Sequence, residues 1–475
     1  MRTRRSRRAV VFVTLGSCVF SGCVHYNTLY NAENLYQEAE DLRLAGQDSA
    51  VSARYREVVD KATGGYRADE AGGYADDTLL LIAKAHFRLG EIPEATRALE
   101  RFFEVSEDAD LRAQAALYRG VMAVAVGETA RGLALLDMAI ERVDEPTHLA
   151  EGHLWRARAF FRRGMEAQGW RDLDRAADIS DAHIVTANLE RIAWGFALPD
   201  LTRIHQGIQA LIFTDRAQVY GDSIRSLAQL FAVRWGPLSA GVLLDNAENA
   251  HWSRDERDRL LMTRAGFAYD AGEVRRAERD VVVVGSGVGE MAASARVTLA
   301  RWRFAQVVEV RQLARFRSVL LPAVSYEGAQ VLLDAIRRVE LLTEYGIEGE
   351  PVALIGAAEI ARDVLVAGRL SAALFHRYAV AAPKGPWLGK ALLASRELAP
   401  DPAERDRLDG LLDALPADPY VRYAHTGHGG TDLGELESRL QDVLDPLFTR
   451  VDEELRARRQ LAGELEDEPA DQPQK

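Results

Sequence analysis

Two histidines of the chain have the spacing of a partial metal site. His425 and His428 stand as H-x-x-H in the loop HTGHGGTDLGE, where Asp432 and Glu435 are the nearby carboxylates. Two histidines supply half of the four ligands that zinc prefers, but the chain has only two cysteines and no H-E-x-x-H pattern. We therefore interpret this stretch as a solvated loop, and we predict neither a metal site nor a bound cofactor.

A glycine-rich stretch, DVVVVGSGVGE at Asp280 to Glu290, superficially has the form of a strand followed by a dinucleotide-binding turn. Its spacing is G-x-G-x-G, whereas the nucleotide fingerprint is G-x-G-x-x-G within a βαβ unit. We interpret it as a turn between helical hairpins. The chain has no G-x-S-x-G and no Walker loop, and acidic pairs such as Asp76 and Asp77 are common on solvated helices. We therefore predict no catalytic residue and expect that the chain is not an enzyme.

One pattern of small residues, glycine and leucine appears three times between Ala75 and Asp181, at an interval of 37 residues. Small residues recur where two helices must approach closely, glycine recurs at a turn, and leucine recurs on a packing face. A single helical hairpin cannot bury its apolar side alone, so we expect the copies to stack into one continuous core. The recurring residues are Ala83, Gly90, Ala95, Leu99 and Phe102, then Gly120, Gly127, Gly132, Leu136 and Ala139, and then Ala157, Gly164, Gly169, Leu173 and Ala176.

The pattern resembles the tetratricopeptide repeat, whose usual unit of about 34 residues has small residues at positions 8, 20 and 27. It departs from that family at position 4, where Leu79, Ala116 and His153 replace tryptophan, and it lacks the proline of position 32. The resemblance implies an all-α fold, an α-solenoid of stacked helix hairpins made of divergent tetratricopeptide repeats. It also implies a protein that binds other proteins.

In families with this fold, the first helix of each hairpin lines a ligand groove through its positions 2, 5, 9, 12 and 13. The resemblance therefore implies a groove that is apolar at its centre and basic at both ends, which suits an extended acidic peptide or a partner's terminal carboxylate. The alternative is that these cations balance Glu and Asp of neighbouring hairpins. The implied groove residues are Lys84, Phe87 and Arg88 in the first copy, Val121 and Val124 in the second, and Arg158, Phe161 and Arg162 in the third.

Helical periodicity continues on both sides of the three copies. Ala32 to Ala45 and Asp48 to Ala62 form an expected first hairpin, followed by a glycine-rich loop, TGGYRADEAGGYAD. The motif returns with Gly272 at the turn and, more loosely, around Gly368. Residues 291 to 345 alternate apolar and arginine-rich positions at helical spacing. Pro446 is expected to kink or split a charged helical stretch near the end of the sequence.

The leader is typical of an exported lipoprotein. MRTRRSRR precedes an apolar run from Ala9 to Phe20, and FSGC resembles a bacterial lipobox. This resemblance implies cleavage before Cys23 and a diacylglycerol on its sulfur. Val24, which is not aspartate, favours the outer membrane by resemblance to the lipoprotein sorting rule.

These observations predict seven segments. They are a lipoprotein signal peptide at 1–22, a lipidated tether at 23–31, an N-terminal tetratricopeptide-like solenoid at 32–215, a second helical repeat region at 216–382, a proline-punctuated closing segment at 383–430, a C-terminal helical segment at 431–462 and a disordered acidic tail at 463–475.

The chain carries a net charge of −13, and −18 once the five arginines of the leader are removed. A body this acidic is a poor nonspecific binder of nucleic acid or anionic lipid, so no nucleic-acid partner is expected. The predicted function is a non-catalytic protein-protein interaction scaffold of the bacterial envelope, lipid-anchored at the outer membrane on its periplasmic face.

The expected partners are envelope proteins or their extended peptide segments. The opening YNTLYNAENLYQEAE is similar to repeat lipoproteins of outer-membrane protein assembly and of gliding or secretion machines. Two alternatives stay open. One is a peptidoglycan-acting envelope enzyme, which needs a catalytic module outside the repeats. The other is a solute- or glycan-binding lipoprotein, which needs clustered exposed aromatic residues.

Overall fold

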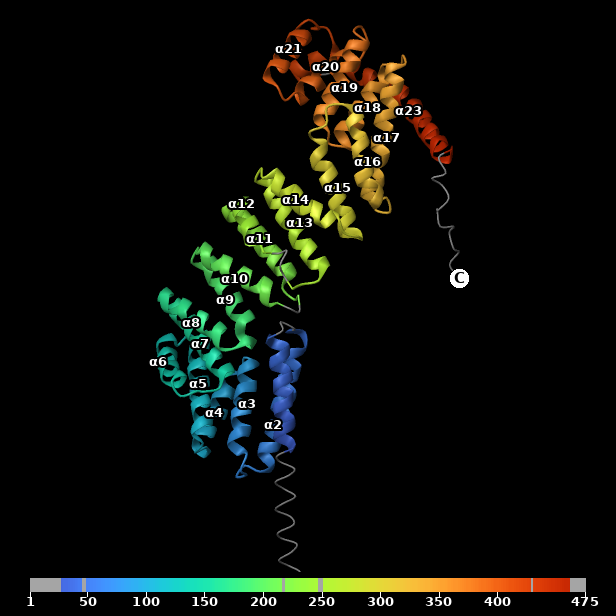
Figure 1. Ribbon diagram of the computed structural model, residues 1–475. Helices are drawn as coiled ribbons and strands as arrows, with labels where there is room; N and C mark the ends of the chain where they lie inside the picture. The colour runs from blue at the N-terminus through green and yellow to red at the C-terminus, as the bar shows by residue number, and fades with distance from the viewer. Residues whose placement is uncertain (1–26, 45–47, 216–217, 247–250, 429, 462–475) are drawn as a thin grey trace, which may run out of the picture. The chain divides into compact units, whose positions relative to one another are not determined.

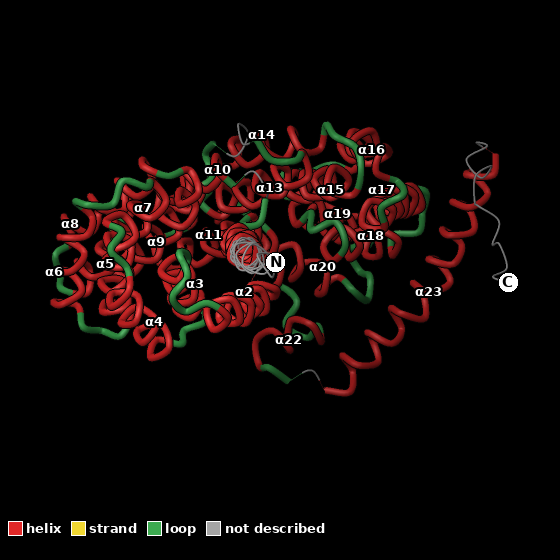
Figure 2. Tube along the Cα trace, turned by 90° about the horizontal axis from the view of Figure 1, so that it is seen from below, coloured by secondary structure: helices red, strands yellow, loops and turns green. Residues whose placement is uncertain are grey.

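The computed structural model describes residues 27–44, 48–215, 218–246, 251–428 and 430–461. Throughout these ranges the chain forms helices and turns without any β-strand, as Figures 1 and 2 show. The prediction of an all-α fold of stacked helix hairpins is confirmed. The predicted signal peptide, the lipidation site Cys23 and the acidic tail lie outside the described residues.

The chain divides into two compact units, Met1–Leu260 and Leu261–Lys475. The predicted boundary between residues 215 and 216 therefore lies inside unit 1. Residues 27–44 form the first helix of unit 1. The elements that follow are α2 (Asp48–Ala68), α3 (Ala75–Arg88), α4 (Ile92–Val105), α5 (Ala109–Ala125), α6 (Thr129–Ile140), α7 (Pro146–Arg162), α8 (Glu166–Ile179), the 3-10 turn η1 (Asp181–His183), α9 (Ile184–Ala197), α10 (Leu201–Thr214), α11 (Gly221–Trp235) and α12 (Pro237–Leu243).

The repeating residues of unit 1 lie where the sequence pattern places them. Consecutive helices pack in pairs, α3 on α4, α5 on α6 and α7 on α8, and the first helices of neighbouring pairs also contact one another. The turns inside the pairs contain Gly90, Gly127 and Gly164, with φ of 77°, 90° and 71°, a left-handed conformation that favours glycine. A Cβ atom on Gly132 would lie 2.4 Å from Cγ2 of Val124, so the small residue is needed for close packing of α6 on α5.

The predicted glycine-rich loop after the first hairpin is shorter than expected. Helix α2 continues through Gly64 and Gly65 to Ala68. A Cβ atom on Gly65 would lie 3.0 Å from Cγ2 of Thr28 in the first helix, and Tyr66 packs against the hydrophobic core. At this place glycine permits two helices to approach closely, and tertiary packing outweighs its low helix propensity.

In unit 2, the stretch that superficially has the form of a nucleotide-binding turn joins two helices. Helix α13 (Arg254–Asp270) begins in unit 1 and ends in unit 2. Helix α14 ends at Gly285, and α15 begins after Gly289, which has a φ of 90°. The interpretation of this stretch as an inter-hairpin turn is confirmed.

The elements after α13 are α14 (Val274–Gly285), α15 (Glu290–Phe304), η3 (Val310–Leu313), α16 (Ala314–Leu320), η4 (Leu321–Ala323), α17 (Glu327–Ile347), α18 (Val352–Asp363), α19 (Gly368–Ala381), α20 (Leu388–Leu398), α21 (Pro402–Asp413), α22 (Pro419–Thr426) and α23 (Gly430–Leu461).

In the looser repeat around Gly368, the left-handed turn residue is not at the glycine that the sequence pattern indicates. Gly272 has the expected left-handed φ of 81°, but Gly368 is the first residue of α19 and the left-handed residue is Val366, with a φ of 56°. The motif is thus regular in α13 and α14 and irregular in α18 and α19.

Helix α23 is continuous through Pro446, so the expected split does not occur. Leu440, Leu444, Leu447 and Val451 are buried on both sides of the proline. Helix α23 packs on α17 and α18, where Gly356 leaves room for Phe448 and Leu444. This packing stabilises the helix across a residue that lacks an amide donor.

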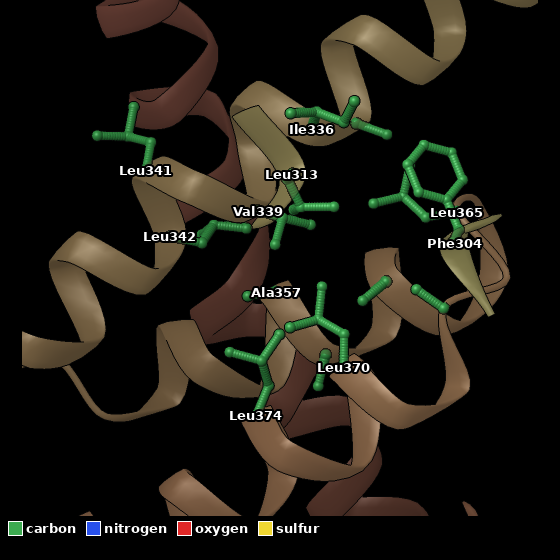
Figure 3. Packing of buried hydrophobic residues seen from close by; sticks show 14 of the residues in the cluster. Phe304, Leu313, Ile336, Val339, Leu341, Leu342, Ala357, Leu365, Leu370 and Leu374 are labelled. Atoms are coloured by element: carbon green, nitrogen blue, oxygen red, sulfur yellow. The ribbon is translucent and has the colours of Figure 1, made fainter. Parts of the chain in front are cut away.

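The core of unit 2 lies between α17, α18 and α19. In Figure 3, Val339 and Leu342 of α17 point toward Ala357 of α18 and toward Leu370 and Leu374 of α19. This core supports the groove described below.

Candidate functional site

The eight implied groove residues come together on three adjacent helices. Lys84, Phe87 and Arg88 lie on α3, Val121 and Val124 lie on α5, and Arg158, Phe161 and Arg162 lie on α7. Helix α5 contacts both α3 and α7. The register therefore places these residues on one side of the repeat.

The apolar members of this set do not line an open groove. Val121 and Val124 are 0% exposed and Phe161 is 5% exposed. The ring of Phe161 stacks on Trp194 at a centroid distance of 4.7 Å and meets the edge of Trp170 at 4.6 Å. The expectation that these side chains form the apolar part of an open groove is therefore wrong. They are buried because they fill the contacts between neighbouring helices.

Arg88 is the centre of a buried ionic network. Its guanidinium donates two hydrogen bonds to Glu40, at 2.6 and 3.2 Å, and two to Glu151, at 2.5 and 2.8 Å. Tyr118 donates to Glu151 at 2.9 Å and Tyr55 donates to Glu40 at 2.5 Å. The side chain of Arg88 is only 7% exposed, so the network joins the first helix, α3 and α7 out of contact with most solvent.

The arginine determines the ionisation of both carboxyl groups. Burial alone would raise the pKa of Glu40, but the charges of Arg88 and Arg43 outweigh it and lower that pKa to about 2. Burial also opposes ionisation of Glu151, and Arg88 nevertheless holds the pKa of Glu151 well below its usual range. Both groups are therefore carboxylates at neutral pH, so neither can act as a general acid there.

Lys84 has two uncharged partners on the next hairpins. Its Nζ donates to Oε1 of Gln114 at 3.1 Å and lies 3.0 Å from Nε2 of His148. Burial lowers the pKa of Lys84 to about 8, and burial together with the charge of Lys84 lowers the pKa of His148 to about 4. At neutral pH this pair is an ammonium donor and a neutral imidazole acceptor.

The arginines of the third copy also have partners inside the chain. Arg158 donates to Glu190 at 2.6 and 2.9 Å, and Arg162 donates to the carbonyl of Val124 at 2.7 Å. The alternative that the sequence left open, cations balanced by acids of neighbouring hairpins, describes the contacts of Arg88 and Arg158. Capture of an acidic peptide by these residues stays a prediction.

The sequence does contain a signal for two partners of these cations, Gln114 and Glu151. Position 2 of the same register holds Asp77, Gln114 and Glu151. The structure pairs Lys84 with Gln114 and Arg88 with Glu151, each from a later copy. Glu40 lies on the first helix, before the three regular copies, so their 37-residue interval does not point to it.

A groove lies in unit 2, and the sequence reasoning missed it. Its volume is about 1130 Å³, and it lies between α16, α17, α19, the end of α23 and the turn before η3. We call it the arginine groove, because six arginines and three glutamates line it. These charged residues are Arg311, Arg317, Arg337, Arg377, Arg458 and Arg459, with Glu309, Glu340 and Glu344.

Three polar groups of the arginine groove have unused donor capacity. Arg377 is exposed, and the structure gives its guanidinium no hydrogen bond or ion pair among the described residues. Nε of Arg459 and Nδ1 of His376 are buried without a hydrogen-bond partner. Because those two atoms are shielded from solvent, Arg377 is the one of these three groups that an acceptor in the groove can reach.

Aliphatic side chains separate the charges of the groove. Val308, Leu321 and Ile347 are 45%, 50% and 64% exposed. A groove with guanidinium groups and exposed aliphatic surface suits an extended peptide, which presents both carbonyl or carboxylate oxygens and side chains.

Sequence reasoning found one component of this groove. The arginine-rich stretch at residues 291 to 345 contributes α16 and α17. The remaining walls come from α19 and α23, which lie far from that stretch in the sequence. No spacing within one segment could therefore predict the complete groove.

The described part of the chain contains no group of three or more His, Cys, Asp or Glu side chains that could hold a metal ion. None of the helices in these ranges is both long enough and apolar enough to cross a membrane. His425 lies at the end of α22, and Nδ1 of the exposed His428 is 2.8 Å from the carbonyl of Thr426.

No protein-family model matches the sequence, and no curated protein is significantly similar to it. Among solved structures, a tetratricopeptide repeat protein from Parabacteroides merdae is 14% identical, with a TM-score of 0.29, over 55% of this chain and 95% of that one. A Rap protein complexed with competence and sporulation factor is 13% identical, with a TM-score of 0.26, over 81% and 99% of the two chains. The tetratricopeptide domain of P58(IPK) is 11% identical, with a TM-score of 0.20, over 88% and 99%.

Paired helices, left-handed turn glycines and small residues at the helix crossings define an all-α protein of stacked helix hairpins.

Proposed function

We propose that this chain is a lipid-anchored, non-catalytic scaffold of the bacterial envelope that holds an extended segment of a partner protein. The observation that carries the proposal is the arginine groove, where the exposed guanidinium of Arg377 and exposed aliphatic side chains line one cavity. An extended segment satisfies such donors with its oxygens and covers the aliphatic surface with its side chains.

The proposed anchor is a diacylglycerol on Cys23, which places the chain on the periplasmic face of the outer membrane. The basic leader, the short apolar run and the S-G-C sequence support this anchor. Stable anchoring requires more than one acyl chain, and lipoprotein maturation supplies several. The proposed partners are envelope proteins of outer-membrane protein assembly or secretion, because residues 26–40 resemble lipoproteins of those machines.

The anchor is tested by metabolic labelling of the full chain with an alkyne fatty acid, followed by mass spectrometry of the mature N-terminal peptide. The expected result is a labelled peptide that begins at Cys23. A Cys23→Ser variant should remain unlabelled and should leave the membrane fraction. Equal labelling of the two proteins, or a mature chain that begins elsewhere, refutes the anchor.

The groove is tested by crosslinking and pull-down from detergent-solubilised envelopes. The test variant is Arg377→Glu, and the matched control is Arg369→Glu, an exposed arginine of the same helix that does not line the groove. We expect one set of crosslinked proteins with the native chain and the control, and at least a tenfold loss of that set with Arg377→Glu. Equal capture by both variants rules out the groove as the binding site.

A further inference from the structure

More arginines than glutamates line the arginine groove, although the whole protein is acidic. Six arginines and three glutamates line it, whereas the whole chain has a net charge of −13. Arg317 pairs with Glu340 at 3.3 Å, and Arg458 pairs with Glu344 at 3.2 Å. Arg311 pairs with Glu309, and both Arg337 and Arg459 pair with Asp334. Within the described ranges Arg377 has no acidic partner, so it can pair with an added carboxylate.

A strongly acidic stretch of the same chain begins at the edge of this groove. Leu455, Arg458 and Arg459, in the last turns of α23, line the groove, and α23 ends at Leu461. The following 14 residues, AGELEDEPADQPQK, contain five acidic residues and one lysine. They begin only three residues after Arg459, which lines the groove.

The chemistry of this stretch matches the lining of the groove. Carboxylates pair with guanidinium groups through strong, often bidentate hydrogen bonds. Leu465 lies between the acidic residues Glu464 and Glu466, and it supplies an apolar side chain for surface such as Ile347. Extended, 14 residues reach up to about 45 Å, so the length of the stretch does not limit where in the groove it binds.

We propose that residues 462–475 bind in the arginine groove of their own chain and that a partner must displace them. The inference rests on the proposed function in one respect, since it assigns an internal competitor to the same groove. A short flexible connection gives a tethered segment an effective concentration on the order of 1 mM. A free-peptide Kd of about 0.1 mM would then be enough to keep the groove occupied about ten times more often than empty.

The test uses a fluorescein-labelled synthetic peptide of residues 462–475 as the probe and fluorescence anisotropy as the measurement. It compares the full chain with a chain that ends at Leu461. The shortened chain should bind the peptide about tenfold more tightly, and Arg377→Glu in the shortened chain should abolish that gain. Arg369→Glu should leave it unchanged. Salt should weaken the binding, because it screens charges in a solvent-accessible groove.

A second variant keeps the chain at full length. It replaces the five acidic residues by their amides: Glu464→Gln, Glu466→Gln, Asp467→Asn, Glu468→Gln and Asp471→Asn. This variant should bind the labelled peptide as tightly as the shortened chain does. Failure of the peptide to bind the shortened chain, or equal binding to all of these proteins, overturns the inference.

The same proteins separate this inference from the proposed function. If removal of residues 462–475 increases crosslinking of the partner set and Arg377→Glu abolishes it, both proposals stand. If Arg377→Glu abolishes partner capture but neither tail change affects it, the internal competitor is refuted and the scaffold proposal stands. If the peptide binds the groove but no partner depends on Arg377, the competitor stands and the scaffold proposal loses its site.

Discussion

Arg264 holds Asp280 through two parallel hydrogen bonds, of 2.7 and 2.8 Å, across the hairpin of α13 and α14. Arg156 holds Asp172 in the same manner, at 2.6 and 2.9 Å, across the hairpin of α7 and α8. In each hairpin the arginine precedes the small residue of the first helix, and the aspartate precedes the large residue of the second. Each unit therefore has an Arg–Asp ion pair of its own, and the two pairs stand at the same positions of the repeat.

The first prediction concerns the pair in unit 2. Arg264→Met leaves Asp280 buried without its principal partner, so the free energy of unfolding should fall by about 3–5 kcal/mol. The double variant Arg264→Met, Asp280→Leu should recover most of that loss, because no buried charge is left unpaired. Urea unfolding followed by far-UV circular dichroism measures both.

The control for this prediction is Arg275→Met, a substitution at an exposed arginine on α14. It should change the free energy of unfolding by less than about 0.5 kcal/mol. A double variant as unstable as the single variant would show that the ion pair itself is a net stabiliser.

The second prediction concerns Arg88 in unit 1. Arg88→Met leaves the carboxylates of Glu40 and Glu151 buried and close to one another, and it should lower the free energy of unfolding by about 3–5 kcal/mol at pH 7. The difference from the native chain should shrink on acidification, since the released carboxyl groups can take up protons in the variant. Arg97→Met breaks the pair with Glu94, where the arginine is 71% exposed, and it should have almost no effect.

The third prediction is a pH dependence that depends on His148. The folded-state pKa of about 4 is below the ordinary value of 6.5, so the unfolded chain binds more protons between these values. Stability should therefore fall as the pH falls through this range. Between pH 7 and pH 5 the loss attributable to His148 should be about 2 kcal/mol.

His148→Gln keeps a hydrogen-bond acceptor for Lys84 without a group that titrates in this range. The variant should lose much less stability than the native chain between pH 7 and pH 5 in urea unfolding. The carboxylates contribute in the same direction but mainly below about pH 5, because their stabilisation is lost as the pH falls from the ordinary value of 4.5 toward the folded value. Equal losses in both proteins between pH 7 and pH 5 would contradict the assignment to His148.

The sequence predicted those parts of the fold that depend on local geometry. A left-handed turn needs glycine and a close helix crossing needs a small residue, so Gly127 and Gly132 have a reason that is visible in the spacing alone. The split expected as one effect of Pro446 does not occur, because the packing of α23 on α17 and α18 outweighs the missing amide donor.

The partners of the charged residues could not be predicted in the same way. Arg88 meets Glu40 across 48 positions and Glu151 across 63 positions of the sequence. Whether a cation faces solvent or a buried carboxylate depends on how neighbouring hairpins are placed, which no single repeat specifies. The arginine groove has the same property, since Arg377 and Arg458 approach one cavity from α19 and α23.

The last prediction distinguishes a glycine needed for packing from one that is not. A Cβ atom on Gly132 would lie 2.4 Å from Cγ2 and 3.0 Å from the backbone nitrogen of Val124, which is fully buried and cannot move aside. Gly132→Ala should therefore destabilise unit 1 by about 1–3 kcal/mol, despite the better helix propensity of alanine. Gly64 lies in α2 with nothing within 4 Å of its added Cβ, so Gly64→Ala should stabilise the chain by up to about 1 kcal/mol. Thermal unfolding should thus shift in opposite directions for the two variants. An unchanged or higher melting temperature for Gly132→Ala would show that a small residue is not required there for the helices to pack.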